Sequence, residues 1–190
     1  MVTLLFPSPM HRQCGTSMIE VLVTIVILAI GLLGLAGLQA RLQSSEMEAY
    51  QRTQALILLN DMANRITTNR ANAVNYVTGT PLGVGATNCN DTSDRQKTDA
   101  SEWCNALQGA AETTGGNKVG AMVGGRGCVE NLGGGEYLIT VAWQGMAPIS
   151  APPASVACGQ NLYNGAAGSS CTGDLCRRAI TTVVRIGNLT

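Results

Sequence analysis

Residues 15–38 read GTSMIEVLVTIVILAIGLLGLAGL, and the organisation of the rest of the chain follows from them. A short polar stretch precedes a lone acid, Glu20, and then an apolar run from Val21 to Leu38 in which only Thr24 is polar. At about 1.5 Å per residue, this run covers nearly the hydrocarbon thickness of a bilayer. A carboxylate at the start of such a segment is costly to place in lipid, so we expect it to have a specific role.

This segment resembles the processing and assembly segment of type IV prepilins. In that family a Gly precedes the cleavage point, and a Glu is the fifth residue of the mature chain. The corresponding residues here are Gly15, Thr16 as the new N-terminus, and Glu20. The longer match, SMIEVLVTIVILAIGLLGLAGLQ, is similar to the PilV-type minor pilins. The resemblance implies cleavage by the prepilin peptidase and N-methylation at Thr16, where the family usually has Phe.

Glu20 has two interpretations. Ser17-Met-Ile-Glu20 matches a capping box, and an acid in the first turn suits the helix dipole. A cap alone does not explain an acid beside a long apolar run, because desolvating a carboxylate there is expensive. The resemblance supplies a partner, the free ammonium of Thr16 on this or a neighbouring subunit. We therefore expect Glu20 to act in assembly.

The composition limits the possible functions. The 190 residues have a formal net charge of zero, and only 13% are charged. Nucleic-acid binding needs clustered Lys and Arg, which this chain lacks, so no nucleic-acid partner is predicted. The 23 glycines are well above the usual share, which predicts long irregular loops.

The cysteines indicate an oxidising compartment. Cys14 precedes the predicted cut, and the mature chain keeps six: Cys89, Cys104, Cys128, Cys158, Cys171 and Cys176. An even number in Gly-rich loops predicts three disulfides and a periplasmic location. About 15 pairings are possible. Proximity along the chain favours Cys89–Cys104, Cys128–Cys158 and Cys171–Cys176.

The N-terminal residues permit two other interpretations. Cys14 invites a lipoprotein interpretation, but a lipoprotein has its apolar run before the cysteine. A secretory signal peptide would have Val21–Gly37 as its apolar region and a cut near Leu38–Ala40. Glu20 and the length of the run disfavour it. Met10 is an alternative start, which would leave the leader MHRQCG.

The predicted segments are a leader (1–15), a transmembrane and assembly helix (16–40), an amphipathic continuation (41–69) and a disulfide-rich periplasmic head (70–190). No proline interrupts 16–69, so one helix of about 50 residues is expected. Its predicted apolar stripe comprises Leu42, Ala49, Leu56 and Ala63, with Leu59 and Ile66 beside them. Its predicted solvent-facing side comprises Glu46, Glu48, Gln51 and Arg52.

Gly31, Gly34 and Gly37 lie three apart in the apolar run. They allow close approach of another helix, as small residues do in membranes generally. Alternatively they weaken the helix so that it can stretch within a filament, since each Gly costs about 1 kcal/mol relative to Ala. Both interpretations remain open.

The head is predicted to begin with loops and one short helix. Residues 80–98 form a Gly/Asn/Asp/Ser loop that holds Cys89, and residues 115–127 form another loop. Between them, Asp99-Ala-Ser-Glu102 resembles a capping box. It would start a helix with Trp103, Ala106, Leu107 and Ala110 on one face.

Strands are predicted late in the chain. Tyr137, Ile139, Val141 and Trp143 alternate in a strand over 137–143, and the pattern repeats with Ile180, Thr182, Val184 and Ile186. A short strand around 128–130 precedes a turn at 131–135. Residues 148–177 form a long loop between the two strands, which we expect disulfides to hold in place. The predicted fold is α+β and pilin-like, a long helix packed on a small antiparallel sheet.

Catalysis is not expected. The single histidine, His11, lies in the leader, and no HExxH, Walker A, GxGxxG or GxSxG pattern occurs. Asn90, Asp91 and Asp94 favour a solvated turn over a calcium site, because a full oxygen shell is not visible. Without a CxxC pair or Cys-His cluster, neither a metal nor a cofactor is predicted.

The resemblance implies a PilV-type minor pilin that primes pilus assembly in twitching motility and adhesion. Implied partners are other major and minor pilins, the prepilin peptidase, the inner membrane, the pilus assembly platform and a tip adhesin. The chain would be a single-pass inner-membrane protein before it enters the pilus. The alternatives are a type II secretion pseudopilin and a secreted disulfide-rich binding protein.

Overall fold

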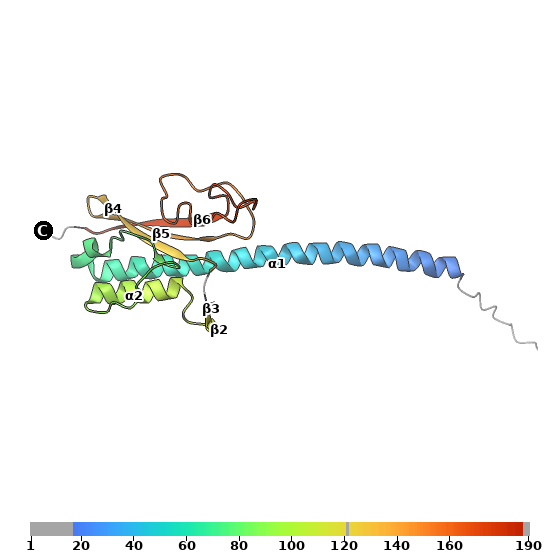
Figure 1. The fold of residues 1–190 in the computed structure, drawn as a ribbon, viewed down its shortest axis with the longest axis horizontal. Helices are drawn as coiled ribbons and strands as arrows, with labels where there is room; N and C mark the ends of the chain where they lie inside the picture. Colours follow the sequence, from blue (N-terminus) through green and yellow to red (C-terminus); the bar gives the residue numbers. More distant parts are fainter. Residues whose placement is uncertain (1–16, 121, 188–190) are drawn as a thin grey trace, which may run out of the picture. The chain divides into compact units, whose positions relative to one another are not determined.

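The computed structural model describes residues 17–120 and 122–187 of the chain. The fold is α+β, with a long apolar N-terminal helix, a small antiparallel sheet and three disulfides, as predicted (Figure 1). The elements are α1 (Met18–Thr68), η1 (Arg70–Tyr76), β1 (Leu82–Gly83), α2 (Arg95–Leu107), β2 (Thr113–Thr114), β3 (Asn117–Lys118), β4 (Arg126–Gly133), β5 (Glu136–Gln144) and β6 (Arg177–Arg185).

Two compact units share the long helix. The first ends at Gln43 and the second, here called the head, begins at Ser44. Within the first unit, every described residue except Ser17 belongs to α1, and all are exposed. The 51 residues of α1 confirm the single helix expected from the absence of proline.

The part of α1 in the head buries Gln51, Ala55, Leu59, Met62 and Ile66. Leu59 and Ile66 were predicted on the buried side, but the predicted seven-residue stripe is wrong. Its members Leu42, Ala49 and Leu56 are exposed, and Ala63 is half-buried. The heptad spacing marks one line along α1, whereas the buried residues are spaced three and four apart and lie on a different face of the helix.

Gln51 was predicted on the solvent-facing side of the helix, and this prediction is wrong. It is only 2% exposed, and its Nε2 lies 3.9 Å from Sδ of Met146, just after β5. Of the other residues predicted to face solvent, Glu46 and Arg52 are exposed and Glu48 is half-buried. The loop that follows β5 covers Gln51, and helical periodicity alone does not reveal that contact.

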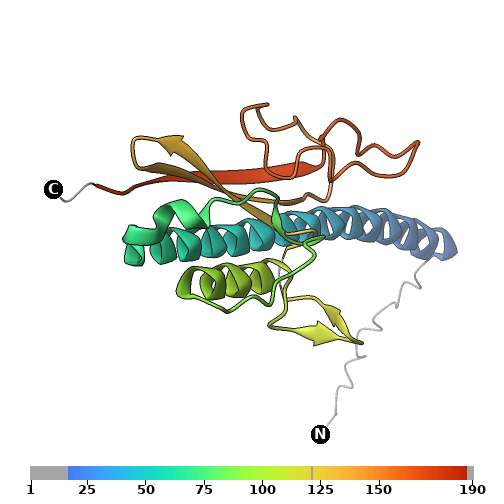
Figure 2. The ribbon, with the colours of Figure 1, turned by 60° about the vertical axis from the view of Figure 1, so that its left-hand side comes forward.

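The sheet is four-stranded and antiparallel, in the order β1-β4-β5-β6. The β5–β6 register runs without a break from Glu136↔Arg185 to Gln144↔Arg177. The β4–β5 pairing has one irregularity, between Asn131 and Gly133, inside the predicted turn. Figure 2 shows the head part of α1 between this sheet and α2.

β5 extends one residue beyond each end of the predicted strand. Its predicted apolar face, from Tyr137 to Trp143, is buried. The opposite face is buried as well, at Thr140 and Ala142. Residues 145–176 cover that face, held there by the Cys128–Cys158 bridge and by the hydroxyl of Tyr163, which donates to the carbonyl of Gly124 at 2.9 Å.

The predicted start of the short helix at Asp99 is wrong. The helix begins at Arg95, four residues before the predicted capping box, and ends at Leu107, before Ala110. Its N-cap is Asp94, whose side chain accepts a 2.8 Å hydrogen bond from the N–H of Lys97. Asp99 therefore lies inside the helix, where other elements supply its partners.

The two predicted loops are partly structured. β1 and the first turn of α2 fall within 80–98, and β3 and the start of β4 fall within 115–127. β1 and β3 are two residues long each and show no clear period in the sequence. They exist because β4 and β2 supply the hydrogen-bonding partners.

Candidate assembly segment

Glu20 lies in the first turn of α1 and is the acid of that turn. The carbonyl of Ser17 accepts hydrogen bonds from the N–H of Glu20 at 2.9 Å and of Val21 at 3.2 Å. Ser17 therefore occupies the position expected of an N-cap. The side chain of Glu20 therefore lies near the positive end of the helix dipole, a position where acidic residues suit a helix.

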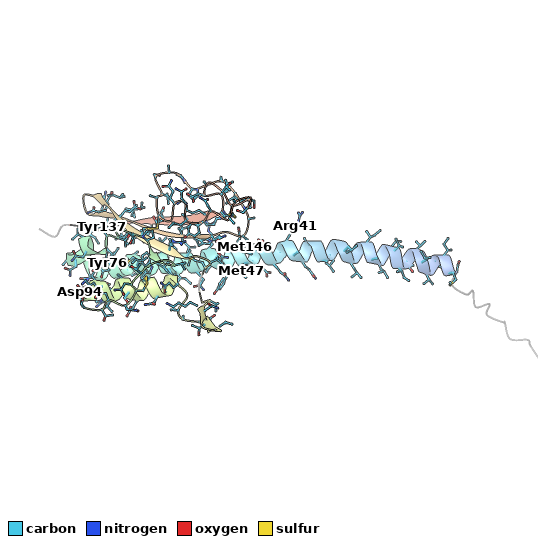
Figure 3. The ribbon with its side chains drawn as sticks, in the orientation of Figure 1. Arg41, Met47, Tyr76, Asp94, Tyr137 and Met146 are labelled. Carbon is cyan, nitrogen blue, oxygen red and sulfur yellow. A yellow bond between two sulfur atoms is a disulfide. The ribbon has the colours of Figure 1, made fainter. Side chains whose placement is uncertain are left out.

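The helix that follows Glu20 is apolar on every side. No charged residue stands between Glu20 and Arg41, and the large side chains in this interval are exposed. Figure 3 shows these side chains projecting around α1. The helix is long and apolar enough to cross a membrane. A helix that is apolar all round needs lipid or another protein to cover it, and this fits membrane anchoring.

The apolar run contains one polar side chain and three evenly spaced glycines. The hydroxyl of Thr24 donates to the carbonyl of Val21 at 2.8 Å, so this polar group is satisfied within the helix. A Cβ added at Gly31, Gly34 or Gly37 would meet nothing within 4 Å. Packing among the described residues therefore does not require these glycines, and both interpretations of them concern other subunits or the filament.

The predicted processing residues Gly15 and Thr16 lie outside the described residues, as do Cys14 and His11. Glu20 is the predicted site residue of this segment that the structure does describe. Its partner remains a prediction.

The six remaining cysteines form three disulfides. They are Cys89–Cys104, Cys128–Cys158 and Cys171–Cys176, the pairs favoured by proximity along the chain. The first ties the loop after β1 to α2, and the second ties β4 to the excursion between β5 and β6. The third closes a short loop just before β6.

A charged cluster in the head was not predicted from the sequence. The buried carboxylate of Asp99 accepts hydrogen bonds from Arg65 Nη1 at 3.0 Å, Arg95 Nε at 3.3 Å and the hydroxyl of Tyr76 at 2.5 Å. Burial, together with this bond to Asp99, raises the pKa of Tyr76 to about 12. The cluster joins α1, η1 and α2 and has a structural role.

The acids considered for calcium are engaged otherwise. The hydroxyl and N–H of Ser93 donate to Asp91 and lower the pKa of its carboxyl, and Lys97 adds an ion pair at 3.2 Å. Asp94 caps α2. Within residues 17–120 and 122–187, no three His, Cys, Asp or Glu side chains are grouped so as to hold a metal ion.

Comparison with known protein families gives the class of the N-terminal segment. Residues 10–36 match the model of the prokaryotic N-terminal methylation motif, a range that includes Gly15, Thr16 and Glu20. Neither a curated protein nor a solved structure matches the chain. The match supports a prepilin of the type IV pilin-like class, which includes pseudopilins. It points to a structural protein that interacts with pilin and prepilin-peptidase machinery.

Proposed function

We propose that this chain is a minor pilin of the type IV pilus, of the PilV type, which primes or supports pilus assembly. The observation that carries the proposal is an acid in the first turn of an apolar helix that no described part of the chain covers, inside a matched methylation motif. The likeness of residues 17–39 to PilV-type sequences favours this role over the broader class.

Processing would occur between Gly15 and Thr16. The prepilin peptidase would read Gly15, since a residue without a side chain fits closest to the cut. Cleavage would leave the ammonium of Thr16 four residues before Glu20, and residues four apart share one face of a helix. N-methylation at Thr16 would follow.

Glu20 would then pair with the Thr16 ammonium of its own or a neighbouring subunit. At low dielectric, opposite charges near 4 Å attract far more strongly than in water, and desolvation offsets much of that gain. The pair would therefore set the register of the incoming helix more than it would stabilise the helix. The exposed apolar side chains would pack against the helices of other pilins.

The decisive experiment compares the incorporation of Glu20→Ala into filaments with that of the parent. We expect incorporation to fall by about tenfold or more, because an unpaired buried ammonium costs several kcal/mol. Glu46→Ala is the matched control, because Glu46 is an exposed acid on the same helix outside the apolar run. If Glu20→Ala entered filaments as readily as Glu46→Ala, the proposed pairing would be wrong.

N-terminal sequencing and intact mass, with and without reductant, test the processing step. The proposal requires a mature chain that starts at Thr16, carries a methyl group and holds three disulfides. A start near Arg41 would instead mean that a signal peptide had been removed, leaving a secreted disulfide-rich protein.

A type II secretion pseudopilin is the second candidate, because the methylation motif is shared by that class. Deletion of the gene separates the two. Loss of twitching motility and attachment supports the minor pilin, whereas loss of protein secretion with normal pili supports the pseudopilin. In both cases the chain would sit in the inner membrane with its head in the periplasm, and would contact the assembly platform and a tip adhesin only as a minor pilin.

A further inference from the structure

The two edges of the head sheet differ in how well they are protected. β1 is two residues long and follows Pro81. The N–H of Gly83 donates to Sγ of Cys104 at 3.2 Å, and its carbonyl accepts from Nε2 of Gln108 at 2.9 Å. Because Cys104 in α2 and Gln108 at its C-cap satisfy these groups, the β1 edge is closed to another strand.

β6 forms the other edge and has none of these protections. It is nine residues long, has no proline, and pairs with β5 in an unbroken register. In the described part of the chain, no strand pairs with its outer side. Natural sheets usually guard an edge with short strands, prolines or bulges, because an open edge is a template for pairing.

The register shows which backbone groups of β6 are free. The N–H of Ile186 donates to the carbonyl of Gly135, and the carbonyl of Cys176 accepts from the N–H of Gly145, each at 2.8 Å. In an antiparallel pair, alternate residues bond to the neighbouring strand. The even-numbered residues of β6 therefore face β5. The N–H and C=O groups of Ala179, Thr181, Val183 and Arg185 face away from it.

The side chains along this edge suit strand pairing. Thr181 and Val183 are β-branched and exposed, Val183 by 50%. The guanidinium of Arg185 pairs with Glu136 on β5, yet its side chain is 76% exposed. Glu136 lies directly opposite Arg185 in the β5–β6 register, so a strand on the open side could present a second carboxylate to the remaining donors.

We propose that the outer edge of β6 binds an extended strand of another protein, which adds a fifth strand to the sheet. The partner strand would carry β-branched residues opposite Thr181 and Val183 and an acid facing Arg185. The proposal rests on the minor-pilin function, and it names a contact through which the head would join its neighbours in an assembly.

A second copy of this chain fits the edge poorly. Its β1 edge is closed, as described above. Figures 1 and 2 show β6 and the head part of α1 running in the same direction, so antiparallel β6–β6 pairing would place the two Ser44 residues at opposite ends. Two chains anchored in one membrane cannot pair in this way. Parallel self-pairing needs an offset of one residue, which two-fold symmetry forbids.

The test places a photoreactive amino acid at Thr181 or at Val183 of the full chain in its natural host, with exposed Ser170 as the control position. Both edge positions should give an adduct with one other protein. The residue modified in that protein should move by two positions between the two probes, because facing strands keep register. Ser170 should give no such adduct.

Two variants block the edge without breaking the fold. In Val183→Pro the lost N–H points away from β5, so the β5–β6 ladder stays intact. It should lower the adduct yield from the Thr181 probe by about tenfold, since it removes a donor and crowds the incoming strand. Thr181→Lys should do the same for the Val183 probe. Both variants should retain three disulfides and the parent melting temperature.

The proposal would be overturned if the adducts formed with a second copy of this chain, or if no adduct formed in cells where the chain enters filaments. It would also be overturned if the two probes modified the same residue of the partner or scattered residues. A third contrary result would be adduct yields that Val183→Pro and Thr181→Lys leave unaffected. Failure of the minor-pilin function itself would be seen in a separate experiment, as incorporation of Glu20→Ala into filaments at the level of the parent chain.

Discussion

The hydroxyl of Tyr76 donates a 2.5 Å hydrogen bond to Oδ2 of Asp99 and so joins η1 to α2 inside the head. Asp99 is 3% exposed and also accepts from Arg65 and Arg95. A carboxylate at this depth is tolerated because three donors surround it. The first two predictions follow from this contact.

Replacing Tyr76 by Phe should lower the free energy of unfolding by about 1–3 kcal/mol, because it leaves a buried carboxylate oxygen without its donor. Denaturant unfolding of the full chain in detergent measures this. Tyr50→Phe is the control, since Tyr50 is 48% exposed and should change stability by less than about 0.5 kcal/mol. Equal effects of the two variants would show that the Tyr76–Asp99 bond contributes little.

The same contact predicts a loss of stability at alkaline pH. The folded pKa of Tyr76 is raised to about 12, above the usual value near 10. The neutral phenol therefore stabilises the fold fully below about pH 10, and this contribution is lost as the pH rises through about 12. Unfolding followed between these pH values should show a decline that is smaller in Tyr76→Phe. A decline of the same size in both proteins would assign it to other groups.

Gly127 packs directly beneath Trp103. A Cβ at Gly127 would lie 2.2 Å from Cη2 of Trp103, which is fully buried and donates a 2.9 Å hydrogen bond to the carbonyl of Leu58. Gly127→Ala should therefore destabilise the head by about 1–3 kcal/mol through overpacking, seen as a lower melting temperature. In Gly79→Ala the new Cβ meets nothing within 4 Å, so that variant should melt with the parent.

The three disulfides should differ in their contributions. The loops they close span 30 residues for Cys128–Cys158, 15 for Cys89–Cys104 and 5 for Cys171–Cys176. Loop entropy then predicts losses of about 3.5, 3 and 2 kcal/mol for the three double Cys→Ser variants. Thermal unfolding of each variant measures the order. A greater loss for Cys171–Cys176 than for Cys128–Cys158 would contradict the loop-entropy explanation.

Local sequence signals predict an element well where that element does not depend on distant residues. The unbroken run without proline predicts α1 to within two residues at its start, and alternation predicts β5 to within one. The capping box at Asp99 is a counter-example. Its sequence fits an N-cap well, yet Arg65 and Tyr76 supply better partners inside the helix, and Asp94 takes the capping role.

The sequence by itself determined the apolar segment with its acid, the single long helix and the even number of cysteines, because these depend on residue type and short-range spacing. Only the tertiary structure decided which face of α1 is buried, that both faces of β5 are covered, and that β6 is an open edge. These depend on which segments far apart in the chain come together. Gln51 shows the difference: it is polar and was predicted in water, yet it lies beneath Met146, almost a hundred residues away.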